Sequence, residues 1–125
     1  MSFRSSNIYH RTNKKSIVMI QITITDGRVR IEGHAGYAPI GYDIVCAGVS
    51  ALADTLVMSF CELTKSIITV NDDYGLMEIE VESPTEAGML LMDSFVIGIS
   101  AIADDYPDNV SVRDDRSRRE TITIE

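Results

Sequence analysis

Cysteine and histidine are scarce in this sequence, which has two of each among its 125 residues. Because they lack the spacing of paired metal ligands, they cannot supply the four ligands of a structural zinc ion, and we expect neither a metal nor a cofactor. Cys46 and Cys61 fall in one predicted helix, about 22 Å apart at about 1.5 Å per residue. A disulfide needs Cα atoms within about 7 Å, so we expect reduced thiols and a reducing compartment.

Positive charge is also in short supply, because 11 basic residues stand against 19 acidic ones, for a formal net charge of -8. Phosphate backbones repel an acidic protein, so nucleic acid is not expected as a direct ligand. A basic peptide or basic protein would be attracted. The same charge also serves to keep a cytosolic protein soluble, and composition does not choose between these two interpretations.

The sequence shows no signal peptide and no uninterrupted apolar run that reads as a membrane span. Its first residues, "MSFRSSNIYHRTNKK", lack an apolar h-region, and the longest apolar tracts are broken by Asp54, Glu62 and Asp93. Residues 1–18 have neither a helical nor a strand period, and we expect a flexible leader there, or a mis-start upstream of Met19. We therefore predict a cytoplasmic protein that does not contact a membrane.

The sequence does contain a regular succession of strand and helix patterns. The stretch "IVMIQITIT" is rich in β-branched residues, and the Asp26-Gly27 pair after it is typical of a hairpin turn. Two later stretches are apolar nearly all round, as in buried helices. Asp43 is the expected N-cap of the first helix, and Ser83, with Glu86 completing a capping box, that of the second. The expected strands cover 17–25, 29–35, 66–70, 76–83 and 110–115, and the expected helices cover 43–63 and 83–104.

This ββαββαβ order predicts an α+β protein, specifically a two-layer α/β sandwich whose mainly antiparallel sheet carries two helices on one face. One domain, 19–115, would hold this fold, followed by a charged C-terminal tail, 116–125. Both helices have more apolar surface than one sheet face can cover. We therefore expect a homodimer or another bound partner.

The residues that could take part in catalysis lie in the stretch "GHAGYAPIGYDIVCAGVSAL". With Asp43 as the N-cap, Cys46 lies in the first helical turn, where free N–H groups and the helix dipole lower the pKa of a thiol. His34, at the end of the preceding strand, could pair with the thiolate and protonate a leaving amine, and the Cys46 N–H could stabilise an oxyanion. Gly36 and Gly41 would let the intervening loop act as a gate. From the residues alone, an inert buried cysteine or a redox-sensing thiol stays an open interpretation.

The same stretch resembles the signature of a known family. The residues "GHA…GYDIVCAGVSAL" are similar to those of the bacterial ribosomal-processing cysteine protease family Prp, and the resemblance extends over most of the chain. It implies that Cys46 is the nucleophile and that His34 is the general base or ion-pair partner. Asp43 matches the family's acid, which would cap the helix, orient His34 or hold substrate. Ser50 matches a serine that would hydrogen-bond substrate or backbone.

The resemblance also implies a fold, an oligomeric state and a substrate. Members of the family are two-layer α/β sandwiches that dimerise, and they remove the N-terminal extension of a large-subunit ribosomal protein, the twenty-seventh, during ribosome maturation. This chain departs from the usual pattern at Gly48, where alanine is common, at a cost to helix stability on the order of 1 kcal/mol. The alternative function is a non-enzymatic ribosome-associated assembly factor that binds a basic ribosomal protein through its loop and acidic face.

Overall fold

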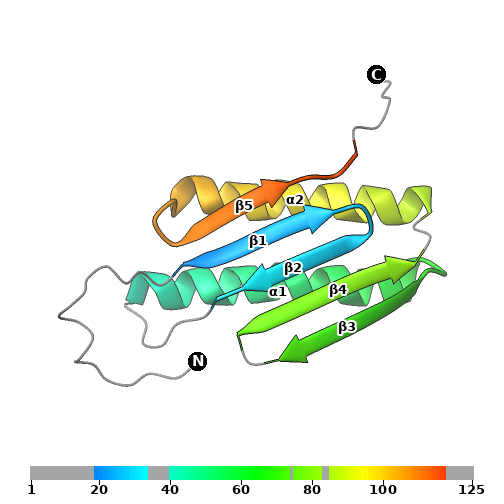
Figure 1. The fold of residues 1–125 in the computed structure, drawn as a ribbon, viewed down its shortest axis with the longest axis horizontal. Coiled ribbons are helices and arrows are strands. Elements are labelled where there is room, and N and C mark those ends of the chain that lie inside the picture. Colours follow the sequence, from blue (N-terminus) through cyan, green and yellow to red (C-terminus); the bar gives the residue numbers. More distant parts are fainter. Residues whose placement is uncertain (1–18, 34–39, 74, 83–84, 118–125) are drawn as a thin grey trace.

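The computed structural model describes residues 19–33, 40–73, 75–82 and 85–117. These residues form five strands and two helices in the order β-β-α-β-β-α-β, which confirms the predicted succession (Figure 1). The elements are β1 (Ile20–Thr25), β2 (Arg28–Glu32), α1 (Ile40–Leu63), β3 (Ile67–Asp73), β4 (Leu76–Glu82), α2 (Glu86–Asp105) and β5 (Val110–Asp114).

All five strands belong to one sheet with the order β3-β4-β2-β1-β5. Neighbouring strands are antiparallel, except that β5 runs parallel to β1. Both helices lie on the same face of the sheet, side by side and antiparallel to each other (Figure 1). The predicted two-layer sandwich with a mainly antiparallel sheet is therefore confirmed.

The strand period of two separates an apolar face from a polar face of the sheet. Ile20, Ile22 and Ile24 of β1 are almost fully buried, whereas the residues between them point to the other face. The remaining buried core residues are Val29, Val45, Val49, Ala53, Leu56, Phe60, Ile79, Val81, Met92, Phe95, Ile99 and Val110. On the open face, exposed ion pairs cross from β2 to β4, with Arg28–Glu80 at 3.0 Å and Arg30–Glu78 at 2.7 Å. A sheet of this kind buries one face only, which accounts for two layers.

Glycines bring the two helices into close contact. A Cβ added at Gly98 of α2 would lie 3.0 Å from Leu52 Cδ1 on α1, and one at Gly48 of α1 would lie 3.2 Å from Ile102 Cδ1 on α2. Each of these glycines therefore faces a large side chain on the other helix. Gly48, which departs from the usual family pattern, is part of this interface.

The start of α2 differs from the prediction. Ser83, the expected N-cap, lies outside the described residues, and the N-cap is Thr85, whose Oγ1 accepts a hydrogen bond from the Gly88 N–H at 3.1 Å. Glu86, expected three residues into a capping box, is instead the first helical residue, where its negative charge suits the helix dipole. Ser83 and Thr85 both carry a hydroxyl that can cap a helix, and the prediction of Ser83 is wrong.

The chain stays attached to the domain beyond the predicted boundary at residue 115. Arg116, assigned to the solvated tail, forms ion pairs with Asp93 of α2 at 2.8 Å and with Asp114 at 2.9 Å. Ser117 donates two hydrogen bonds to Asp26 in the β1–β2 turn, from its N–H at 2.9 Å and from its hydroxyl at 2.6 Å. The Ser117 hydroxyl is the main cause that lowers the pKa of Asp26, and the Arg116 guanidinium is the main cause that lowers the pKa of Asp114.

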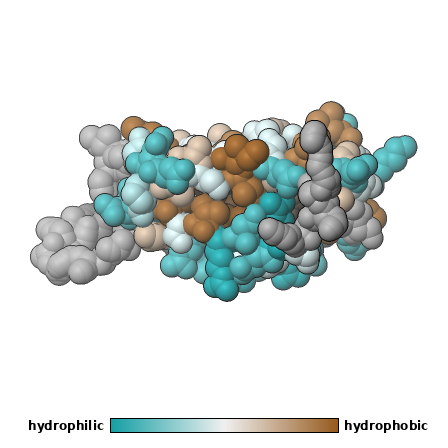
Figure 2. Space-filling view, turned by 90° about the horizontal axis from the view of Figure 1, so that it is seen from above, coloured by the Kyte–Doolittle hydropathy of each residue, from teal (hydrophilic) through white to brown (hydrophobic). Residues whose placement is uncertain are grey.

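The helix layer keeps large apolar side chains on its surface. Ile44 and Met58 of α1 are each 58% exposed, and Leu90 and Ile97 of α2 are 67% and 71% exposed. Figure 2 shows hydrophobic patches between strongly hydrophilic areas. The expectation that the helices carry more apolar surface than one sheet face covers is therefore confirmed for the described residues.

Both helices are long and apolar enough to cross a membrane by length and composition alone. The core helices of soluble proteins pass the same test, and here each helix packs one side on the sheet through buried residues such as Val49 and Phe95. Length and composition therefore do not decide between the two settings. The absence of membrane contact stays a prediction.

Candidate active site

The helix that carries Cys46 begins earlier than predicted. α1 starts at Ile40, so Asp43, the expected N-cap, is its fourth residue, and Cys46 is its seventh. The sequence signal that indicates this start is Pro39, because proline is favoured at the beginning of a helix, where its missing N–H has no intrahelical acceptor. The capping potential of Asp43 masked this signal.

The earlier start changes the electrostatics predicted for the thiol. The effect of a helix dipole falls off within the first turn, and Cys46 lies in the second turn. N–H groups beyond the first turn donate to the carbonyl four residues earlier, so the Cys46 N–H is used within α1 and is not an oxyanion donor. Both expectations that depended on Asp43 as the N-cap are wrong. The first turn of α1 therefore does not provide the stabilisation predicted for a thiolate at Cys46.

Cys46 is half-buried, packs against the core and is not in a disulfide. It lies on the flank of α1 that faces away from α2, because at about 100° per residue it is about 160° around the helix from Gly48, which faces α2. Since α2 contacts β5 at one edge of the sheet and α1 contacts β3 at the other, this flank is turned toward the β3 edge. Ser50 is exposed one turn further along the same flank.

The second cysteine, Cys61, differs from its expected environment. Because the helix dipole disfavours a thiolate late in a helix, we expected Cys61 to be a small buried apolar residue, but it lies near the end of α1 and is exposed. Within the part of the chain that the structure describes, no three His, Cys, Asp or Glu side chains are grouped so that they could hold a metal ion. Cys46 is therefore the half-buried thiol and Cys61 the solvent-facing one.

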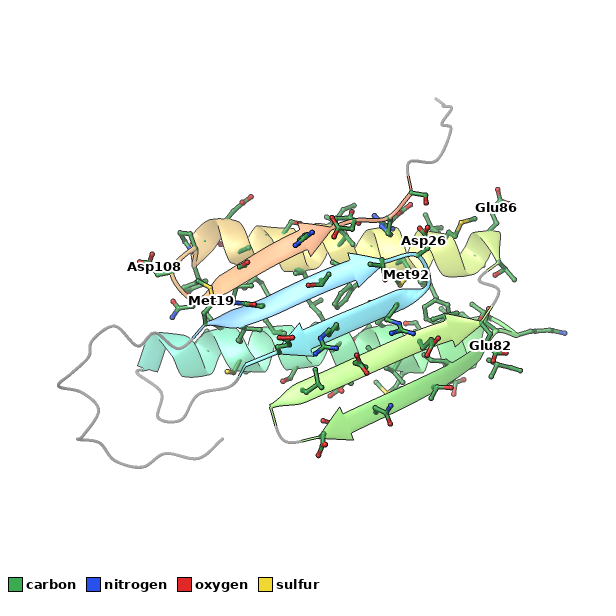
Figure 3. The ribbon with its side chains drawn as sticks, viewed as in Figure 1. Met19, Asp26, Glu82, Glu86, Met92 and Asp108 are labelled. Carbon is green, nitrogen blue, oxygen red and sulfur yellow. The ribbon has the colours of Figure 1, made fainter. Side chains whose placement is uncertain are left out.

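The strand that leads to the predicted histidine ends at a tightly constrained glycine. Gly33 has a φ of +101°, and its N–H donates a hydrogen bond to the carbonyl of Gly75, in the β3–β4 hairpin, at 2.9 Å. A Cβ at this position would overlap the carbonyl oxygen of Met19. Figures 1 and 3 show this end of β2, the start of α1 and Met19 at the same end of the domain.

The predicted gating loop and catalytic pair include residues that the structure does not describe. His34 and Gly36 lie outside the described residues, as does the side chain of Asp43. Gly41, expected in the gating loop, is the second residue of α1, so this assignment is wrong. Seven residues, 33–39, separate β2 from α1, as many as the predicted elements leave between them, but three positions earlier in the chain. The pairing of His34 with Cys46 stays a prediction.

Fold and site together define a small α+β protein with a half-buried cysteine near the start of a core helix. This cysteine lies at the end of the domain where β2, the strand before His34, also ends. A family model described as cysteine protease Prp matches residues 19–111. The chain therefore belongs to the cysteine protease Prp family, and it is an enzyme rather than the non-enzymatic factor considered above.

Named relatives and solved structures extend the comparison. The chain is 29% identical over 101 residues to the ribosomal processing cysteine protease Prp of Staphylococcus aureus (strain Mu50 / ATCC 700699), which covers 75% of this chain and 95% of that protein. It is also similar to the crystal structure of the S. aureus enzyme in complex with a substrate peptide, with a TM-score of 0.69, 25% identity, and 78% and 99% of the two chains covered. The same enzyme with a covalently linked product peptide gives a TM-score of 0.66 and 27% identity over 78% of this chain and 99% of that chain.

Proposed function

We propose that this chain is a cysteine endopeptidase that removes the N-terminal extension of a large-subunit ribosomal protein, the twenty-seventh, during ribosome maturation. The observation that carries the proposal is the family match, which spans one domain containing both His34 and Cys46. The ribosomal processing activity named for the S. aureus relative supplies the substrate class. A net charge of -8 suits a basic ribosomal protein as the partner.

Cys46 is the proposed nucleophile, and the S. aureus enzyme with a covalently linked product peptide supports a covalent mechanism. The Cys46 thiolate attacks the carbonyl carbon of the scissile peptide bond and forms a C–S bond. The C–N bond then breaks, and the His34 imidazolium gives its proton to the leaving amine. Water attacks the resulting thioester while His34 accepts a proton from it. The new carboxylic acid leaves, and the thiolate–imidazolium pair is restored.

His34 is the proposed source of the charge that stabilises this thiolate. Cys46 is in the second turn of α1, so the helix dipole contributes less than it would in the first turn. Within the described residues, the four arginines are already paired with acids, and Lys65 lies two residues beyond the end of α1, whereas Cys46 lies near its start. We therefore assign the role of the cation to an imidazolium from the segment that joins β2 to α1.

Three further groups near Cys46 have proposed roles in binding. The first N–H groups of α1, around Gly41, have no acceptor within the helix. They lie about one turn before Cys46, on the N-terminal side toward which helical side chains tilt. We assign the oxyanion to these N–H groups. Asp43 and Ser50 lie three residues before and four residues after Cys46, on the same flank of the helix. In this scheme Asp43 orients His34, and Ser50 holds the substrate backbone.

The proposed working form is a cytoplasmic homodimer. The exposed side chains of Ile44, Met58, Leu90 and Ile97 give the helix layer apolar surface that a second copy would cover. Native mass spectrometry at micromolar concentration tests this directly, with twice the chain mass of 13.8 kDa as the expected result. A monomer at that concentration would contradict it.

The function is tested by cleavage of the extended ribosomal protein carrying a C-terminal tag. Wild type is expected to shorten it at one position, and Cys46→Ala is expected to leave it intact while keeping the fold. Cys61→Ala is the matched control, because it removes the exposed thiol of the same helix and should cleave like wild type. Cleavage by the Cys46→Ala variant would refute the mechanism. Binding without cleavage by wild type would contradict the proposed substrate.

A further inference from the structure

Gly33, directly after β2, is fixed by three constraints, two of which only glycine satisfies. Gly33 has a φ of +101°, in the region that L side chains rarely adopt, and a Cβ there would overlap the carbonyl oxygen of Met19 at the start of β1. Its N–H is bonded to the carbonyl of Gly75 at 2.9 Å. The last residue before His34 is therefore held from two sides of the sheet, by β1 and by the β3–β4 hairpin.

We propose that Gly33 is a positioning residue of the protease, which sets the point and direction in which the chain leaves β2 and so brings His34 to Cys46. This inference rests on the Cys46–His34 pair of the proposed function. Consecutive Cα atoms are about 3.8 Å apart, so the backbone of His34 starts one peptide unit beyond a rigid point. Because Cys46 lies too far along α1 to rely on the helix dipole, the position of the imidazole decides whether the thiolate forms.

The proposed role is that of an anchor and differs from that of a hinge. A hinge glycine needs room to change its dihedral angles, whereas Gly33 is confined by its hydrogen bond to Gly75 and by the close approach of Met19. A displacement of about 1 Å at a reacting group can cost about 100-fold in rate, so a small shift of this anchor has a large expected effect.

Gly27, at the other end of the same strand, provides a matched control. Its φ is +72°, and a Cβ there would lie 2.9 Å from the Val81 carbonyl oxygen on β4. The Val81 N–H also donates a hydrogen bond to the Gly27 carbonyl at 2.7 Å. Alanine at either glycine therefore meets a carbonyl oxygen and an unfavourable φ. Gly27 follows Asp26, which lies at the end of the domain opposite Met19 (Figure 3), so only Gly33 is next to the proposed site.

The test compares Gly33→Ala with Gly27→Ala, both with Cys61→Ser so that Cys46 is the only thiol. Two quantities are measured below the melting temperature of each variant: kcat/KM on the extended ribosomal protein, and the pH midpoint of Cys46 alkylation by iodoacetamide. Both variants should melt at a lower temperature than wild type. Gly33→Ala is expected to lose about 100-fold in kcat/KM and to shift its alkylation midpoint up toward the free-thiol value of about 8.5, whereas Gly27→Ala should keep both close to wild type. Equal losses in the two folded variants, or an unshifted midpoint in Gly33→Ala, would overturn the inference.

A second variant separates backbone conformation from folding if Gly33→Ala does not fold. Gly33 is replaced by D-alanine, which favours a positive φ and carries its methyl group on the other side of Cα. Native chemical ligation at Cys46 makes this accessible, with residues 1–45 synthetic and 46–125 recombinant. The folded D-alanine protein should keep the wild-type alkylation midpoint, and a free-thiol midpoint would refute the anchor role. Unimpaired cleavage by His34→Ala would instead refute the Cys46–His34 pair itself, so the two failures are distinct.

Discussion

Two glycines in the helix interface should respond differently to the same substitution. Alanine gains about 1 kcal/mol over glycine inside a helix. At Gly48 the new Cβ would meet only Ile102 Cδ1, at 3.2 Å, and this terminal methyl of a half-buried side chain can shift by a few tenths of an ångström. A modest rotation of that side chain costs about 0.5–1.5 kcal/mol at most. Gly48→Ala is therefore expected to leave stability nearly unchanged, within about 0.5 kcal/mol of wild type in either direction.

At Gly88 the new Cβ would lie 2.8 Å from Cε1 and 3.4 Å from Cζ of the Phe60 ring, which is fully buried. A rigid ring without free space cannot give way, and overpacking of this kind costs about 1–3 kcal/mol. After the gain in helix propensity, Gly88→Ala is expected to destabilise the protein by up to about 2 kcal/mol. Between the midpoints of the two ranges, the alanine variants should thus differ by about 1 kcal/mol.

Urea denaturation at one fixed protein concentration measures this difference, since stability depends on concentration if the chain dimerises. The denaturation slope should be the same in both variants, with the midpoint near wild type for Gly48→Ala and lower for Gly88→Ala. Gly48→Ala should also cleave the extended substrate like wild type, because residue 48 faces α2 and Cys46 does not. If Gly88→Ala were the more stable of the two, the described packing of α1 on α2 would be refuted.

Two further predictions concern the ends of the domain and the surface of the helix layer. Asp26→Asn should weaken the acid dependence of stability, because the Ser117 hydrogen bonds lower the pKa of Asp26 in the folded state. That contribution is present above the unfolded pKa of about 3.9 and is lost as the pH falls through the lower folded value. The unfolding free energy, measured by urea denaturation at several pH values below about 4, should therefore fall less steeply with decreasing pH in the variant than in wild type. An equal fall in both proteins would contradict this prediction. Ile97→Glu, at a side chain that is 71% exposed, should convert the dimer to a monomer in native mass spectrometry without unfolding it. Gln21→Glu on the open sheet face is the control with the same added charge, and an Ile97→Glu protein that is still dimeric would place the interface elsewhere.

Much of the fold could be predicted from local pattern. Alternation in β1 identified Ile20, Ile22 and Ile24 as one buried row, and the order of elements then fixed a two-layer sandwich. The sequence pattern did not identify the N-cap of α2, because Ser83 and Thr85 lie two residues apart and both carry a hydroxyl that can cap a helix. The exposed position of Cys61 could not be deduced from an apolar helix whose own outer face is uncovered.

Contacts between distant parts of the chain were the least predictable. Ser117 binds Asp26 across 91 positions of sequence, and nothing local in a charged C-terminal stretch indicates that contact. In the site, the motif predicts Cys46 and His34, but the group expected to stabilise a thiolate depends on where α1 begins. A shift of that start from Asp43 to Ile40 moves Cys46 out of the first turn, which is why the proposed mechanism assigns the electrostatic role to the imidazole.

The central claim is that an imidazole from outside α1 holds the Cys46 thiolate. The most direct measurement is the pH dependence of Cys46 alkylation in Cys61→Ser protein, with and without His34→Ala, while circular dichroism monitors the fold. The account predicts that Cys46 reacts well below the free-thiol pKa of about 8.5, and that His34→Ala moves the midpoint up to that value. A low midpoint that survives the loss of His34 would contradict it, because the thiolate would then be stabilised by the helix or by another group.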